Sequence, residues 1–195
     1  MIRVYTDGSC SNNGFKGAIS GIGIFFEQDD PRNVGGRIRG KQTNNTAELS
    51  AIIHVFSILE DDIMAQKSIE IYSDSQYAIR CATSYGEKLS KKGWKSKGSK
   101  PIPNMELVKT IFNLYNPYSN VSFHHVRAHT NKNDEHSLGN AEADRIANEA
   151  VQDKNSSFIE IRQQLQQQPI QIKENKNPKR SLIQTNITDY FNYLN

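Results

Sequence analysis

The sequence has few cysteines and no long apolar run, and both absences exclude classes of protein. Its 195 residues include two cysteines, Cys10 and Cys81, too few for a disulfide framework or, without histidines in register, a zinc site. No apolar run approaches the roughly 20 residues of a membrane span, and the N-terminus lacks the charged-then-apolar pattern of a signal peptide. We therefore expect a soluble, intracellular protein with no membrane partner.

Charge of either sign is nearly balanced overall, but it is unevenly distributed. The formal net charge is +3, which says little about partners. Residues 88–100 ("KLSKKGWKSKGSK") nevertheless hold six lysines and no acid, with Trp94 in the middle and glycines on both sides of it. A lysine run is most often only a solvated face, whereas the glycines and the tryptophan favour a presented loop. We call residues 88–100 the basic segment, and its lysines are Lys88, Lys91, Lys92, Lys95, Lys97 and Lys100.

The periodicity of apolar residues predicts one α/β domain followed by a polar tail. Three strand-like runs come first, and helices then alternate with two further strands, so we expect a mixed sheet covered by helices. In the first long helix, Ala47, Ala51, Ile52, Val55, Phe56 and Leu59 share one face, and Asn45 or Thr46 is the expected N-cap. The expected strands are 1–9, 17–30, 33–43, 67–75 and 120–129, and the expected helices are 44–62, 75–88, 104–116 and 139–153.

The pattern ends after about residue 153, which sets the predicted domain boundaries. Residues 154–180 are rich in Gln, Asn and Lys, a composition typical of a disordered linker. We therefore predict a catalytic domain over 1–153, a linker over 154–180 and a tail motif over 181–195.

Four acidic residues stand at places where they can meet. Asp7 and Asp74 are expected to close two strands, and Glu48 and Asp144 are expected in the first turns of two helices. Strand C-ends and helix N-termini gather at one rim of an α/β sheet. Each acid alone is equally well explained as a turn former or as a partner of the helix dipole. Together they repel one another unless cations bind, and oxygen ligands of this kind suit two Mg²⁺ ions placed for phosphodiester hydrolysis.

Five stretches carry a family resemblance, in this order: "YTDGSC", "TNNTAEL", "YSDSQYAI", "KKGWKSKGSKPIPN" and "GNAEADRIANEA". Together they resemble type 1 ribonuclease H over about residues 2–152. The resemblance implies a ribonuclease H fold, with a five-stranded mixed sheet and helices on both faces. It also implies hydrolysis of the RNA strand of RNA/DNA hybrids with Mg²⁺, or Mn²⁺, giving 5′-phosphate and 3′-hydroxyl ends. The implied metal ligands are Asp7, Glu48, Asp74 and Asp144.

The resemblance also assigns a histidine and a set of nucleic-acid contacts. His129 matches the family's mobile histidine, although the stretch that follows it is about five residues longer than typical and contains His136 as an alternative. Histidine suits proton transfer because its pKa lies near working pH. The family positions that contact the hybrid are matched by Asn13, Asn44, Asn45, Gln76 and Tyr85. Tyr85 could equally be a core residue. Family positions that bind phosphate are matched by Lys41, Thr43 and Asn104, and the basic segment resembles the family's basic protrusion.

The first catalytic strand is expected to begin at residue 2, so we expect no separate N-terminal hybrid-binding domain. Two other functions remain open. One is a DNA nuclease of the same superfamily, and the other is a hybrid-binding protein without catalysis. A comparison of cleavage on RNA/DNA, RNA/RNA and DNA/DNA duplexes separates them.

The C-terminal tail carries a second pattern. Gln184, Ile187, Tyr190 and Phe191 resemble the peptide that docks on the sliding clamp of eukaryotes, archaea and their viruses, and Lys179 and Arg180 add positive charge before it. An amphipathic turn that folds back on the nuclease is the alternative. With the nuclease upstream, we expect a monomer that removes primers or R-loops during replication. The expected location is the nucleus or a viral replication compartment if the source is eukaryotic or viral, and the cytoplasm otherwise.

Overall fold

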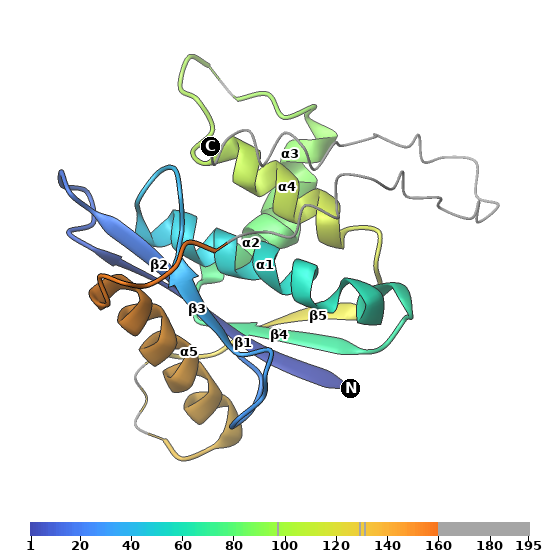
Figure 1. Cartoon of the computed structure of the whole chain (residues 1–195). Coiled ribbons are helices and arrows are strands. Elements are labelled where there is room, and N and C mark those ends of the chain that lie inside the picture. Colours follow the sequence, from blue (N-terminus) through green and yellow to red (C-terminus); the bar gives the residue numbers. More distant parts are fainter. Residues whose placement is uncertain (97, 129, 131, 160–195) are drawn as a thin grey trace.

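The computed structural model describes residues 1–96, 98–128, 130 and 132–159. Its five strands follow the predicted order and form a single sheet in the spatial order β3-β2-β1-β4-β5 (Figure 1). The first three pair antiparallel, whereas β1, β4 and β5 pair parallel, so the predicted mixed sheet is confirmed. The strands are β1 (Ile2–Ser11), β2 (Ile19–Phe25), β3 (Val34–Arg37), β4 (Ile69–Ser73) and β5 (Val121–His125).

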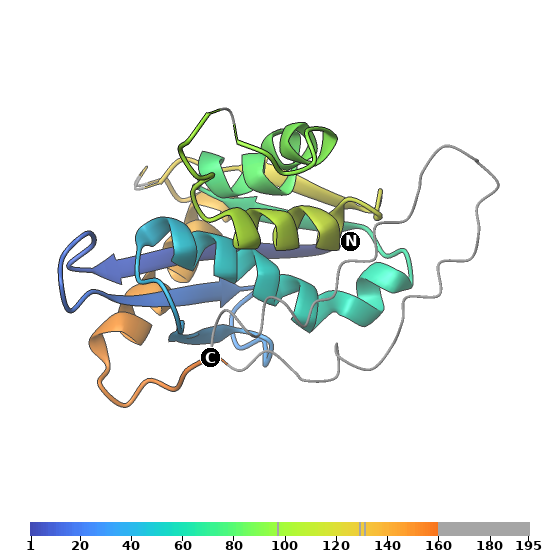
Figure 2. The same ribbon diagram turned by 90° about the horizontal axis from the view of Figure 1, so that it is seen from above.

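Helices cover both faces of this sheet, as predicted. Four helices lie over one face and α5 lies under the other, an arrangement that Figures 1 and 2 show from two directions. The helices are α1 (Asn44–Met64), α2 (Gln76–Ala82), α3 (Ser84–Lys91), α4 (Met105–Tyr115) and α5 (Glu135–Gln152). Within the described residues, no helix combines the length and the apolarity that crossing a membrane requires.

The main core lies between the sheet and α1 to α4. It consists of fully buried aliphatic side chains from both layers, among them Val4, Ile22, Ile52, Ile71 and Ile111. Burying one such side chain contributes roughly 1.5–3 kcal/mol. The predicted apolar face of the first long helix is confirmed, since Ala47, Ala51, Ile52, Val55, Phe56 and Leu59 are all buried.

The predicted N-cap of α1 and the predicted start of α5 are both wrong. The N-cap of α1 is Thr43, not Asn45 or Thr46: its hydroxyl accepts from the N–H of Thr46 at 3.2 Å, and the Thr46 hydroxyl accepts from the N–H of Thr43 at 3.0 Å. This reciprocal pair satisfies N–H groups that a helix start leaves unpaired. In α5, Asp134 is the N-cap and accepts from the N–H of Ser137 at 3.0 Å. Glu48 and Asp144 therefore lie inside their helices rather than in the first turns.

The single helix predicted over 75–88 is also wrong, because the structure divides it into α2 and α3. The division falls at Thr83, whose φ and ψ are −123° and −110°. Its hydroxyl donates to the carbonyl of Ile79 at 2.7 Å. A threonine hydroxyl that bonds the carbonyl four residues earlier in this way competes with the helical hydrogen bonds and favours a break.

The chain continues in contact with the sheet after α5. The N–H of Arg37 donates to the carbonyl of Ser157 at 3.0 Å, and the N–H of Ile159 donates to the carbonyl of Arg37 at 2.9 Å. The guanidinium of Arg39 lies 4.4 Å from the ring centre of Phe158. Residues 156–159 thus run beside β3, and we call them the edge segment. The first residues of the predicted linker accordingly lie against the sheet.

Candidate active site

Two aspartates meet where the parallel pairing of β1 and β4 ends. The last paired residues are Thr6 and Ser73, and Asp7 and Asp74 come directly after them. Asp7 does not close its strand as predicted, because β1 continues to Ser11 while pairing with β2. Asp74 does follow the end of β4. The two carboxylates therefore share one rim of the sheet.

Glu48 reaches this rim because α1 lies against the backbone of β1. A Cβ added at Gly8 would overlap with the backbone nitrogen of Glu48 and with Ala47, so only glycine permits this approach. The Glu48 carboxylate accepts a hydrogen bond from the hydroxyl of Ser75 at 2.5 Å. Since Ser75 follows Asp74 in the chain, this bond holds Glu48 beside the end of β4.

Asp144 is brought in from the opposite face by a second close approach. Gly23 pairs with Asp7 across β1 and β2, and a Cβ at Gly23 would overlap with the carbonyl oxygen of Ala143 in α5. Asp144 is the next residue, and its carboxylate accepts from the side-chain amide of Asn148 at 2.9 Å. Asp144 therefore stands next to the rim that carries Asp7.

The electrostatics of Asp7 show that these carboxylates influence one another. Asp7 is 8% exposed, and burial together with the nearby carboxyls of Asp74 and Asp144 raises its pKa to about 8, against the opposing effect of the Gly8 N–H. Burial also raises the pKa of Glu48, with the Ser75 hydroxyl acting in the opposite direction. Acids crowded in this way favour a bound cation or a proton over free charge.

Asn140 is a site residue that the sequence patterns did not reveal. It is 3% exposed, and its amide nitrogen lies 3.4 Å from a carboxylate oxygen of Asp74. Its amide oxygen is buried and has no hydrogen-bond partner among the described residues. Asn140, Asp144 and Asn148 follow one another at spacings of four along α5, which places them on one helical face. That spacing is the signal that could have identified the two asparagines.

The donor chemistry of the rim fits a hard divalent cation. All four acids offer oxygen ligands, and burial disfavours the charged forms of Asp7 and Glu48 unless a positive charge is present. Over the described ranges 1–96, 98–128, 130 and 132–159, no three His, Cys, Asp or Glu side chains converge closely enough to form a metal-binding group. Asp7, Asp74 and Asp144 nevertheless lie close enough to influence one another, and their oxygen atoms suit Mg²⁺ chemically.

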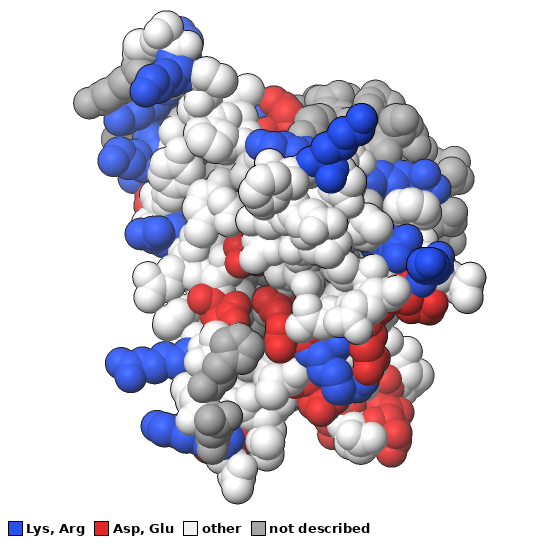
Figure 3. Space-filling model, turned by 90° about the vertical axis from the view of Figure 1, so that its left-hand side faces the viewer, with Lys and Arg blue, Asp and Glu red and all other residues white. Residues whose placement is uncertain are grey.

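Figure 3 looks onto this end of the molecule, with acidic side chains near the middle of the face and basic ones above and below them along its left side.

Among the predicted hybrid contacts, Asn13 accepts from the backbone N–H of Asn44 at 3.4 Å, so the β1–β2 loop meets the start of α1. Asn45 is exposed beside them, and Gln76 is exposed at the start of α2. Tyr85 is only half-buried and packs against the main core.

The predicted phosphate contacts come from two separate parts of the chain. The Lys41 ammonium lies 3.4 Å from the side-chain oxygen of Asn104, and the Asn104 amide donates to the hydroxyl of Tyr77 at 3.3 Å. Thr43 lies close by in sequence as the N-cap of α1. Lys41 and Asn104 are thus brought together, while the Thr43 hydroxyl is engaged in capping.

The basic segment includes the end of α3 and the loop that follows. Trp94 packs edge-on against the ring of Phe112, with 6.2 Å between ring centres. The backbone N–H of Trp94 donates to the carbonyl of Leu89 at 2.9 Å. Trp94 therefore anchors the loop, while the described lysines are exposed, with Lys91 paired to Glu87 at 2.6 Å. The exposed lysines are Lys88, Lys91, Lys92, Lys95 and Lys100.

Some predicted residues cannot be placed. His129, Lys97, Gln184, Ile187, Tyr190 and Phe191 lie outside the described residues. The alternative histidine, His136, lies in the first turn of α5 and not in a loop. Its Nδ1 is 3.1 Å from the hydroxyl of Tyr5, and its ring stacks on Tyr72 with 4.3 Å between centres. These are the contacts of a packing residue.

Comparisons with known proteins agree with this fold. The model of the RNase H family matches residues 1–152. Ribonuclease H of Schizosaccharomyces pombe is 39% identical over 145 residues, which are 74% of this chain and 50% of that protein. Ribonuclease H of Clostridium botulinum is 32% identical over 155 residues, 79% of this chain and 97% of that protein.

A solved structure supports the fold alone. The solution structure of the PFV RNase H domain has a TM-score of 0.62 at 22% identity, covering 77% of this chain and 93% of that one. The chain spans about half the length of several relatives, that of S. pombe among them. Because the family match extends over most of its length, the chain belongs to the RNase H family.

Proposed function

We propose that this protein is an endoribonuclease that hydrolyses the RNA strand of RNA/DNA hybrids and leaves 5′-phosphate and 3′-hydroxyl ends. The observation that carries the proposal is the meeting of the buried Asp7 with Asp74 at the end of the β1–β4 pairing, where α1 and α5 also bring Glu48 and Asp144. An acid in such a position is unfavourable when ionised unless cations share the site. Membership of the RNase H family supports the same activity.

Asp7, Glu48, Asp74 and Asp144 would hold two divalent cations, Mg²⁺ or Mn²⁺. When bound, such ions lower the pKa of a water molecule and neutralise charge on the leaving oxygen. The protein's own part is to hold the carboxylates in place. Each outer carboxylate has a fixed partner, namely Ser75 for Glu48, Asn140 for Asp74 and Asn148 for Asp144. Such partners orient ligands and limit their movement.

The hybrid would be recognised beside this rim. Asn13, Asn44 and Asn45 meet where the β1–β2 loop contacts the start of α1, and neutral donors of this kind can test for a 2′-hydroxyl. Lys41 and Asn104 would hold a phosphate of the DNA strand, and the exposed lysines of the basic segment would add affinity that does not depend on sequence. His129 would assist proton transfer or product departure.

Cleavage of matched RNA/DNA, RNA/RNA and DNA/DNA duplexes in Mg²⁺ tests the proposal. We expect cutting of RNA/DNA only, and we expect Asp74→Asn to abolish cleavage while hybrid binding remains. Glu149→Gln is the matched control, because Glu149 is an exposed acid on α5 paired with Arg145. Equal cutting of DNA/DNA would support a DNA nuclease instead, and full activity of Asp74→Asn would refute the metal-site assignment.

The C-terminal pattern supports a second part of the proposal. Gln184, Ile187, Tyr190 and Phe191 would dock on a sliding clamp and bring a monomeric enzyme to hybrids formed during replication, in a nucleus or a viral replication compartment. Calorimetry of a peptide of residues 179–195 with a clamp protein checks this. Binding should be lost when Tyr190→Ala and Phe191→Ala are combined, and an unchanged affinity would remove the clamp from the proposal.

A further inference from the structure

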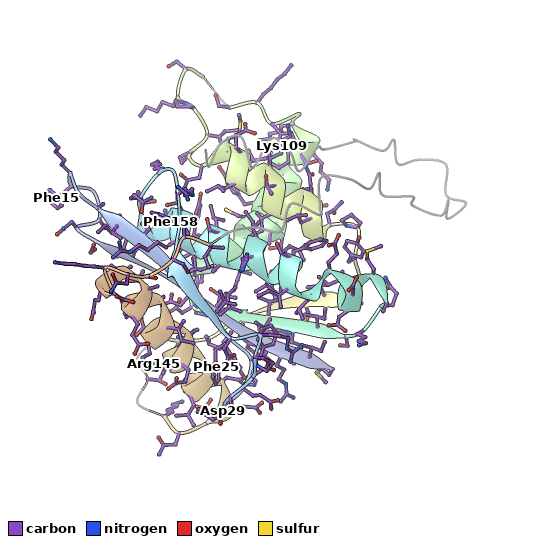
Figure 4. The ribbon with its side chains drawn as sticks, viewed as in Figure 1. Phe15, Phe25, Asp29, Lys109, Arg145 and Phe158 are labelled. Carbon is purple, nitrogen blue, oxygen red and sulfur yellow. The ribbon has the colours of Figure 1, made fainter. Side chains whose placement is uncertain are left out.

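The loop between β1 and β2 presents an aromatic ring to solvent. Phe15 is 78% exposed, more than any other large hydrophobic side chain among the described residues. Figure 4 shows it at the tip of the β1–β2 loop, at the left-hand end of the molecule. Phe158, the other exposed phenylalanine, is 44% exposed and carries the guanidinium of Arg39 over its ring. Phe15 has no such contact in the described part of the chain.

The loop holds this ring outward through its own hydrogen bonds. The N–H of Phe15 donates to the carbonyl of Asn12 at 2.9 Å, and the N–H of Ala18 donates to the carbonyl of Phe15 at 3.3 Å. Asn12 adopts a left-handed backbone with a φ of 50°. Phe15 is therefore displayed by two consecutive turns, which leave a large apolar ring in water although its burial would be favourable.

The position of the loop indicates what the ring meets. Asn13, two residues before Phe15, is bonded to the backbone of Asn44 at the start of α1. That junction is where we place contacts with the minor groove of the hybrid. Lys16 follows Phe15 and is also exposed, so a cation suited to phosphate stands next to the ring.

We propose that Phe15 packs its ring against the sugar edge of the hybrid's minor groove, next to the nucleotides contacted by Asn13. A shallow, wide groove of A-like geometry exposes sugar and base edges on which an aromatic face can rest. The contact adds affinity for any hybrid sequence, because every nucleotide offers a sugar. The inference rests on the proposed hybrid cleavage and identifies a binding residue for it.

Steady-state cleavage of one RNA/DNA hybrid provides the first test. Phe15→Ala should raise KM about ten-fold and leave kcat unchanged, as expected for one lost stacking contact, and Phe15→Trp should restore KM. The salt dependence of binding should keep its slope, because an apolar contact releases no counterions. Met64→Ala is the matched control, since Met64 is 57% exposed at the far end of α1.

Fluorescence provides the second test, in full-length protein that also carries Asp74→Asn so that the hybrid stays intact. With Phe15→Trp, adding hybrid should change the fluorescence emission of the introduced indole. With Met64→Trp, the emission should change only by the amount that the native Trp94 contributes. An unchanged KM for Phe15→Ala, or equal emission changes in the two variants, would overturn the inference about Phe15. The proposed function would still stand in that case if the wild-type protein cuts the hybrid. Failure of the wild-type protein to cut any hybrid would refute both.

Discussion

The face of the sheet under α1 to α4 buries branched aliphatic side chains such as Ile22, Ile52 and Ile71, whereas the face under α5 buries the rings of Tyr5 and Tyr72 with Ala143. The first face carries most of the apolar burial and hence most of the stabilisation. The second is built from rings and small residues. The difference teaches that one face supplies most of the apolar burial, while the other packs α5 through rings and small residues beside the carboxylate rim.

On both faces of the sheet a glycine lets the backbone of a helix approach closely, but the surroundings differ. Gly8 admits the backbone of α1, and Gly23 admits the backbone of α5. Since α1 is enclosed by a large core and α5 rests on a smaller one, the same added methyl group should have different consequences on the two sides. The following four experiments test that contrast, from the largest expected effect to the smallest.

Gly8→Ala should have the largest effect on stability. The added Cβ would overlap with the backbone of Ala47 and Glu48, and α1 cannot retreat without opening the main core. We expect the free energy of unfolding to fall by about 3 kcal/mol, measured by urea denaturation followed by circular dichroism. A loss below about 1 kcal/mol would show that the α1 face yields as easily as the other.

Gly23→Ala should reduce activity more than stability. Moving α5 displaces Asp144, and a shift of about 1 Å near reacting groups lowers kcat on the order of 100-fold. Gly35→Ala is the control, because its Cβ would meet a side-chain methyl group of Ile146 in the same helix at 2.6 Å, while the nearest backbone atom lies 3.3 Å away. Equal kcat values for the two variants would contradict the special role of the contact at Gly23.

Asp7→Asn should stabilise the metal-free protein at pH 7. The pKa of Asp7 is raised to about 8 in the folded protein. As pH rises above 3.8, the carboxyl of Asp7 therefore loses its proton in the unfolded chain but keeps it in the folded chain. The resulting destabilisation grows between pH 3.8 and about 8. We expect a gain of about 2 kcal/mol in thermal or urea unfolding at pH 7, no gain for the exposed Asp29→Asn, and no cleavage activity.

A further comparison uses Mg²⁺ in the same unfolding experiment. A cation that binds the folded state alone raises stability with its concentration. Wild-type protein should therefore gain stability on addition of Mg²⁺, whereas Asp7→Asn should gain less. Equal responses would mean that the ion acts away from the rim.

His54→Leu should have the smallest effect, confined to mildly acidic pH. His54 lies in the α1 face, 9% exposed, and burial lowers its pKa to about 4. The unfolded chain takes up a proton below its ordinary pKa and the folded chain does not, so stability falls as pH drops. Between pH 7 and 5.5 the wild-type protein should lose about 1 kcal/mol more than the variant. Parallel pH profiles would show that the His54 ring is protonated within the fold.

Much of this architecture follows from patterns in the sequence, and the exceptions depend on contacts between distant residues. Alternating and helical periodicities are local, so the order of strands and helices and the buried face of α1 are predicted correctly. The adjacency of Asp7 and Asp74 follows from the parallel pairing of their strands. The N-cap of α1 and the start of α5 are missed because Thr43 and Asp134 cap these helices from outside the apolar pattern.

The supporting residues of the rim are the least predictable part. Nothing local distinguishes Gly8 or Gly23 from a turn glycine, because their role depends on helices that arrive from elsewhere in the chain. Asn140 likewise acquires its role through Asp74, which lies 66 residues earlier in the sequence. The assignments of His129 and of the tail beyond residue 159 stay predictions.

The edge segment has a consequence for how the molecule meets other chains. The edge strand of an open sheet presents unpaired N–H and C=O groups, which template the addition of strands from neighbouring molecules. Residues 156–159 occupy that position beside β3, bonded to both backbone groups of Arg37, and so restrict self-association at this edge. The described part of the chain thus ends beside β3. A pull on the chain at residue 159 would therefore act on the β3 edge and not on β1 and β4, the strands that carry Asp7 and precede Asp74.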